Sequence, residues 1–165
     1  MAAAAFSCQA QSADEVAPTH WRFGLQFGTA QDRNRTEPTG QLSLAYAIDR
    51  TWSVEALANF SLLFVRTGGL KPGDHEFDSA AGARVLATLP LGERWSLVGG
   101  LGVVYVEDEV GDDTYLGNTH FYKTTPMVSL DAMYRLGRRW SIGLETSSYT
   151  QAHTFNVGLR SEFHF

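Results

Sequence analysis

Apolar and polar residues alternate along most of this chain, with a period of two. The pattern is clearest in the last segment, 154–165, where Phe155, Val157, Leu159 and Phe163 share one face and polar residues fill the other. Successive side chains of a β-strand point to opposite sides, so this period predicts strands with two different environments. We predict eight such strands, at residues 20–31, 39–48, 52–66, 76–90, 95–107, 119–135, 140–150 and 154–165.

The segments between the predicted strands alternate between short and long. Segments 48–53, 91–96 and 136–141 each contain a short polar turn followed by Trp-Ser, which is typical of a hairpin. The other connections are rich in Gly, Asp, Asn and Pro. They are predicted at 32–40, 67–74, 108–119 and, shortest, 149–153. Strict alternation of short and long connections predicts an antiparallel up-and-down meander.

The apolar faces indicate how such a meander is closed and where it lies. No apolar run approaches the roughly 20 residues that a membrane-spanning helix needs, and the mean hydropathy is −0.17. A soluble sheet would leave the aromatic edge at Phe165 exposed, whereas a closed barrel in a membrane has no edge and places lipid outside. The predicted fold is therefore all-β, an eight-stranded antiparallel up-and-down transmembrane β-barrel.

Aromatic residues gather at one end of the predicted strands. Each of three tryptophans opens a strand just after a short turn, and two phenylalanines end the last strand at the same level. Such side chains prefer the membrane–water interface, so we predict a periplasmic girdle. The alternative, that the tryptophans plug the end of a soluble barrel, stays open. The girdle residues are Trp52, Trp95, Trp140, Phe163 and Phe165.

Charged residues occupy the inward-facing positions of several strands at similar distances from the same end. Buried charges are costly unless they are paired, and neighbouring strands offer the pairs Glu55–Arg84 and Glu145–Arg160. Because eight strands leave room only for side chains, we predict a salt-bridged polar core and no open pore. The predicted lumenal network is Glu55, Arg84, Asp131, Glu145, Arg160 and Glu162.

With its repeated Arg-Trp-Ser turns, lumenal ion pairs and aromatic end, the sequence resembles the OmpA-type transmembrane barrel, in particular the small OmpX/Ail-like group. The resemblance covers about residues 20–165 and rests on pattern. It implies a bacterial outer-membrane location with both barrel termini periplasmic. It also implies contact with membrane lipids and lipopolysaccharide, and assembly machinery that recognises the C-terminal strand through Phe165. The implied role is envelope structure or cell-surface interaction through the outer loops, with an unknown extracellular partner.

Some small outer-membrane barrels are enzymes, and the lipid A deacylases among them resemble a Ser–His–acid hydrolase. The matching region here, 145–153, has the wrong order and spacing of Ser and His. Such an enzyme would need Thr146, Ser148 and His153 to converge on the outer face. We therefore predict no catalytic residues. A lipid-modifying enzyme stays the first alternative, and a soluble lipocalin-like binder, which requires a hollow apolar interior, stays the second.

The histidines lack close metal-ligand spacing, so we predict neither a metal site nor a cofactor. A predicted outer loop carries the acidic residues Glu107, Asp108, Glu109, Asp112 and Asp113. This loop is either a solvated surface or a place where divalent cations gather against lipopolysaccharide phosphates.

The net charge, the cysteine count and the N-terminal residues bear on the partners and on where the barrel domain begins. A formal net charge of −5 argues against nucleic acid, and the single cysteine, Cys8, excludes an intramolecular disulfide. Residues 1–18 combine a short apolar run with small residues, as at the end of a secretory signal peptide. We predict a signal-peptide remnant and tail at 1–18, followed by one barrel domain at 19–165 that acts as a monomer.

Overall fold

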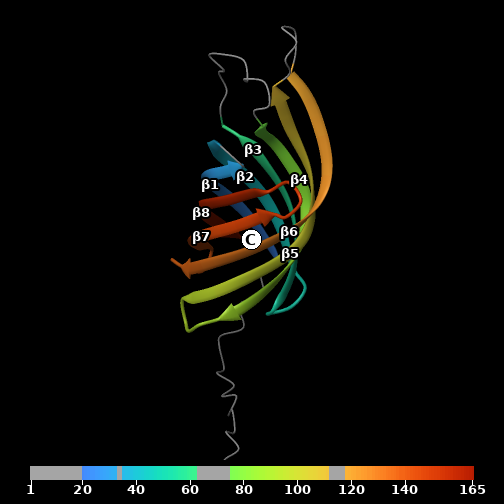
Figure 1. The fold of residues 1–165 in the computed structure, drawn as a ribbon. Coiled ribbons are helices and arrows are strands. Elements are labelled where there is room, and N and C mark those ends of the chain that lie inside the picture. Colours follow the sequence, from blue (N-terminus) through green and yellow to red (C-terminus); the bar gives the residue numbers. More distant parts are fainter. Residues whose placement is uncertain (1–19, 33–34, 63–74, 112–117) are drawn as a thin grey trace, which may run out of the picture.

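The computed structural model describes residues 20–32, 35–62, 75–111 and 118–165. Within these ranges the chain forms a closed barrel of antiparallel strands, each paired with its sequence neighbours, and β1 pairs with β8 (Figure 1). The strands are β1 Trp21–Asp32, β2 Arg35–Ala47, β3 Trp52–Ser61, β4 His75–Pro90, β5 Trp95–Gly111, β6 Asn118–Arg135, β7 Trp140–Tyr149 and β8 Thr154–His164. The predicted eight-stranded up-and-down barrel is confirmed.

Within the described ranges, the structure contains no helix that is long and apolar enough to cross a membrane.

The two faces of the wall differ as the period of two predicts. In β3 the exposed and buried positions alternate from Trp52 to Asn59. Large apolar side chains face outward around the barrel, and Leu101 and Leu159 are 67% and 64% exposed. Polar and charged side chains such as Glu55 and Arg160 are almost fully buried inside. A wall that is apolar outside and polar inside is the arrangement expected of a barrel surrounded by lipid.

Two of the predicted connections are wrong in extent. The prediction placed 32–40 in a loop, but β2 already begins at Arg35 and includes Pro38. The prediction also ended a strand at residue 107, whereas β5 continues to Gly111 and pairs with β6 from Asn118. The end of the predicted strand 52–66 lies outside the described residues beyond position 62.

The strands of the wall have unequal lengths. β4, β5 and β6 contain 16, 17 and 18 residues, whereas β3 and β7 contain 10 each. β7 stops pairing with β6 at Met127, although β6 continues back to Asn118 alongside β5. Figure 1 shows β5 and β6 rising past the other strands at the end opposite the short turns. We call β4 residues 75–83, β5 residues 103–111 and β6 residues 118–126 the projecting sheet.

The short turn between β2 and β3 is held by one carboxylate. Asp49 Oδ1 accepts hydrogen bonds from the backbone N–H groups of Trp52 and Thr51, both at 2.7 Å. These two donors lower the pKa of the Asp49 carboxyl below its usual value. The turn thereby fixes the position at which Trp52 enters the wall.

The seam that closes the barrel requires glycine. Gly28 of β1 lies opposite Gly158 of β8, and a Cβ atom added at Gly28 would overlap the backbone of Val157 and Gly158. A clash with backbone cannot be relieved by a change of rotamer. By contrast, a Cβ added at Gly99, on the outward face of β5, meets nothing within 4 Å.

We therefore expect Gly28→Ala to destabilise the barrel by about 1–3 kcal/mol, the usual cost of overpacking, and Gly99→Ala to have little effect. The measurement is urea unfolding of the refolded protein in detergent micelles. Equal midpoints for the two variants would show that the seam tolerates a side chain at Gly28.

Candidate functional site

Two arginines and two glutamates meet at the centre of the lumen. Arg84 donates to Glu55 at 2.6 Å and to Glu145 at 2.8 Å. Arg160 donates to Glu145 at 2.5 Å and also pairs with Glu55. Each arginine thus bridges both glutamates in a closed ring of four charges, and all four side chains are at most 1% exposed. Hydrogen-bonded rings of this kind satisfy charges that would otherwise be too costly to bury.

Other polar groups surround this ring. Glu162 accepts from Arg160 at 2.8 Å, and Asp131 Oδ2 lies 3.9 Å from both arginines. Gln41 donates its amide to Glu145, and Ser43 accepts from Arg160 at 3.2 Å. The six residues predicted as a lumenal network therefore lie together in the structure.

The pairs predicted on adjacent strands account for only half of the ring. Glu55 with Arg84 joins β3 to β4, and Glu145 with Arg160 joins β7 to β8. The other two contacts cross the lumen, from β4 to β7 and from β3 to β8. Strand order alone does not reveal which side chains reach across a barrel, and these contacts were not predicted.

The lumen is more apolar than the sequence indicated. Two clusters of buried apolar residues pack inside the wall in addition to the charged ring. In the larger cluster, Phe77 and Tyr149 have ring centroids 6.2 Å apart, and the Tyr149 hydroxyl accepts from Asn59 at 3.1 Å. The clusters are Ala30, Leu57, Phe77, Ala80, Val104, Val106, Met127, Tyr149 and Ala152, and separately Leu86, Val98 and Met133. Side chains of both kinds fill the interior, so the predicted salt-bridged polar core describes the ring and its surroundings but not these two clusters.

The five predicted girdle residues lie on the outer wall at the end that carries the short turns. The three tryptophans are 48–53% exposed. Trp140 packs edge-on against Phe163 with centroids 5.3 Å apart, and Phe163 stacks on Phe165. The structure adds two tyrosines to this belt, because Tyr46 packs against Trp21 and Tyr134 against Trp95.

A Ser–His–Glu grouping lies at the turn end of the lumen. The Ser141 hydroxyl lies 3.1 Å from His164 Nε2, and Glu162 lies 4.0 Å from the same nitrogen. A catalytic triad instead uses one ring nitrogen for the nucleophile and the other for the acid. This geometry does not support hydrolase chemistry.

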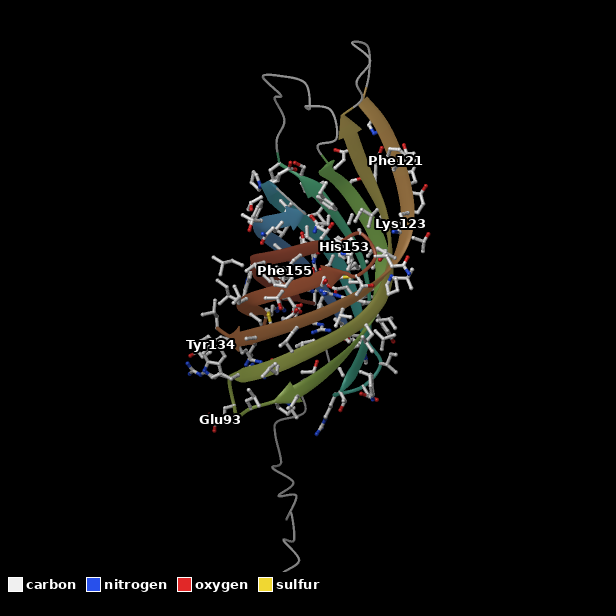
Figure 2. The ribbon with its side chains drawn as sticks, in the orientation of Figure 1. Glu93, Phe121, Lys123, Tyr134, His153 and Phe155 are labelled. Atoms are coloured by element: carbon white, nitrogen blue, oxygen red, sulfur yellow. The ribbon has the colours of Figure 1, made fainter. Side chains whose placement is uncertain are left out.

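A lipid-modifying enzyme would need its catalytic site near Thr146, Ser148 and His153, and the structure gives two of these residues other roles or positions. Thr146 donates its hydroxyl to the backbone carbonyl of Leu130 at 3.0 Å. His153 is exposed in the connection between β7 and β8, with a positive φ of 59° (Figure 2).

The predicted acidic outer loop is in fact largely strand. Glu107, Asp108 and Glu109 lie in β5, within the projecting sheet, while Asp112 and Asp113 lie outside the described residues. The Glu107 carboxylate accepts hydrogen bonds from Tyr122 at 3.0 Å and from Ser79 at 3.2 Å. Lys123 of β6 is exposed and donates to the Gln151 carbonyl at 2.9 Å (Figure 2).

Several solved structures share this architecture. Ail, the attachment invasion locus protein of Yersinia pestis, crystallised with the heparin analogue sucrose octasulfate, has a TM-score of 0.59 at 13% identity, covering 88% of this chain and 96% of Ail. The N-terminal barrel of Pseudomonas aeruginosa OprF has a TM-score of 0.61 at 9% identity, covering 90% and 99%. Neisserial surface protein A has a TM-score of 0.58 at 10% identity, covering 88% and 96%. At these identities the likeness shows the fold.

Sequence comparison supplies the family. No curated protein matches the chain. A family model described as the outer membrane protein beta-barrel domain matches residues 1–163. The chain therefore belongs to the outer membrane protein beta-barrel family of bacterial outer-membrane barrels, and its fold is like that of the Ail and OprF barrels.

Proposed function

We propose that this barrel acts in interactions at the cell surface through its projecting sheet. The observation that carries the proposal is the unequal height of the wall. β6 pairs with β5 along its whole length, but in the described residues it has no partner strand on its other side before Met127. An unpaired strand edge raised above a membrane is suited to bind an extended segment of another protein.

The chemistry of this edge follows from the direction of its peptide groups. The Pro126 carbonyl points toward the β7 side, because it accepts a hydrogen bond from the Thr150 N–H. Peptide groups alternate in direction along a strand, so Thr124 and Tyr122 also direct their backbone N–H and C=O groups to that side. Phe121 and Tyr122, on opposite faces of the strand, are 54% and 57% exposed. A partner strand would thus meet backbone hydrogen-bonding groups flanked by aromatic rings.

We expect Thr124→Pro to abolish adhesion and leave the barrel folded. Proline removes the N–H that faces the open edge, while the neighbouring bonds to β5 remain. The measurement is adhesion of bacteria that display each variant to cultured epithelial cells. Thr124→Ala, which keeps the N–H, is the matched control and should adhere like the original chain.

Adhesion by Thr124→Pro at the level of the original chain would contradict edge recognition. If cells displaying the original chain adhere no better than cells without it, a structural role in the envelope takes the place of surface interaction.

The orientation in the membrane belongs to the same proposal. The exposed tryptophans beside the short turns support a periplasmic girdle, with both barrel termini on that side and the projecting sheet outside. The outward leucines and valines would contact lipid, and the projecting sheet would lie near lipopolysaccharide.

We further propose that assembly machinery recognises Phe165 and that the barrel is monomeric and non-enzymatic. Residues 1–18, proposed as a signal-peptide remnant and tail, lie outside the described residues.

A further inference from the structure

We propose that Asp78, Glu107 and His120 form a binding site for a first-row divalent cation such as Zn²⁺ on the outward face of the projecting sheet. One ligand atom from each of these residues lies within 4.8 Å of the other two. The residues come from β4, β5 and β6, so a bound ion would join three adjacent strands. This site is separate from the charged ring in the lumen.

A β-bulge contributes to this arrangement. The pairing of β4 with β5 shifts register between Phe77 and Ser79, and Asp78 is the extra residue. Phe77 is buried inside the barrel, whereas Asp78 is exposed. Bulges redirect a side chain that a regular strand would place elsewhere. Here the bulged residue is Asp78, and its carboxylate lies near Glu107 of β5 and His120 of β6.

The central carboxylate is already oriented. Tyr122 donates to Glu107 Oε1 and Ser79 donates to Oε2, at 3.0 and 3.2 Å. His120 Nδ1 lies 3.2 Å from Glu107 Oε1. Hydroxyl groups that fix a ligating carboxylate are the usual outer shell of a metal site. Each oxygen keeps a further lone pair for an ion.

The ligand types select the class of metal. An imidazole with two carboxylates suits Zn²⁺ and related transition metals better than Mg²⁺ or Ca²⁺, which prefer oxygen ligands. Two ligands of a tetrahedral Zn²⁺ ion at about 2.1 Å lie about 3.4 Å apart, so the three ligand atoms, which lie within 4.8 Å of one another, would draw together around the ion. Asp78 and His120 are both exposed, and their side chains have room for that adjustment. Positions left open on the ion would face outward, toward water or a phosphate oxygen.

The test is calorimetric titration of zinc chloride into the untagged chain, refolded in zwitterionic detergent. We expect one Zn²⁺ per barrel, with affinity at least tenfold weaker in His120→Ala and in Asp78→Asn. His153→Asn is the matched control, since His153 is exposed outside the cluster and asparagine tolerates its positive φ. This control should bind zinc like the original chain. The faster gel mobility of unboiled protein verifies that each variant is folded.

Zinc affinity within twofold of the original chain in both His120→Ala and Asp78→Asn would overturn the proposal. Two exposed positions are tested so that misfolding of one variant leaves the other informative. Displacement of zinc by a tenfold excess of calcium would overturn the choice of a transition metal.

Discussion

Replacing Arg160 with methionine is expected to destabilise the barrel by about 3–5 kcal/mol, the cost of leaving buried charges without their partner. Arg160 contacts Glu55, Glu145 and Glu162, and its side chain is 1% exposed. Without it, Arg84 alone would have to compensate the carboxylates of the ring. Methionine keeps an unbranched apolar stem like that of arginine, so we expect the loss of charge to outweigh the loss of packing. The measurement is urea unfolding in lipid vesicles, followed by tryptophan fluorescence and by gel mobility without boiling.

Two further variants distinguish the loss of the ring from the loss of any positive charge. Arg138→Ala removes an exposed arginine in the turn between β6 and β7 and should change stability by no more than about 0.5 kcal/mol. The double variant Arg160→Met with Glu55→Gln removes one uncompensated carboxylate and should recover part of the loss. Arg160→Met as stable as Arg138→Ala would show that the ring contributes nothing to folding.

The sequence predicted the barrel well because strand periodicity and closure are repeated constraints. Lipid outside and a packed lumen inside constrain every strand in the same way. A single apolar residue such as Leu101 or Leu159 would not identify the fold, but the same alternation in eight segments does. Short hairpin turns such as the one at Asp49 also carry local sequence preferences. These signals predicted the starts of β3, β5, β7 and β8 correctly.

The strand ends opposite the short turns were harder to predict for a physical reason. Beyond the membrane, a strand meets water on both faces, so the rule that outward residues are apolar no longer holds. The acidic segment beginning at Glu107 therefore resembled a loop, although β5 continues to Gly111 by pairing with β6. Backbone hydrogen bonds extend the sheet there, and they leave little trace in side-chain pattern.

Contacts across the barrel were also beyond the reach of sequence. Arg84 meets Glu145, and Arg160 meets Glu55, from strands that are not neighbours. Asp78, Glu107 and His120 likewise come together because of the bulge in β4 and the pairing registers of β4 with β5 and of β5 with β6. No local spacing motif in the sequence connects these three residues. Periodicity assigns a residue to a face, whereas the partner on that face depends on shear and rotamer.

Replacing Leu159 with arginine should cost about 2–4 kcal/mol in lipid vesicles, as expected for a cation near the bilayer midplane. Leu159 lies at the middle of β8, points outward and is 64% exposed. Arginine at that position would have to leave water, and its side chain would have to reach toward an interface. The measurement is again the urea unfolding free energy of the refolded barrel.

The decisive comparison is with Leu136→Arg in the turn between β6 and β7. Leu136 is 62% exposed, so the two leucines differ in depth and hardly in exposure. Near the interface the same substitution should cost only about 0–1 kcal/mol. If water surrounded the wall, an exposed leucine would tolerate arginine equally well at both positions. A large cost at Leu159 alone therefore requires lipid around the middle of the barrel, with the short turns near the membrane surface. Equal small costs would contradict the proposed depth of the girdle and of the projecting sheet.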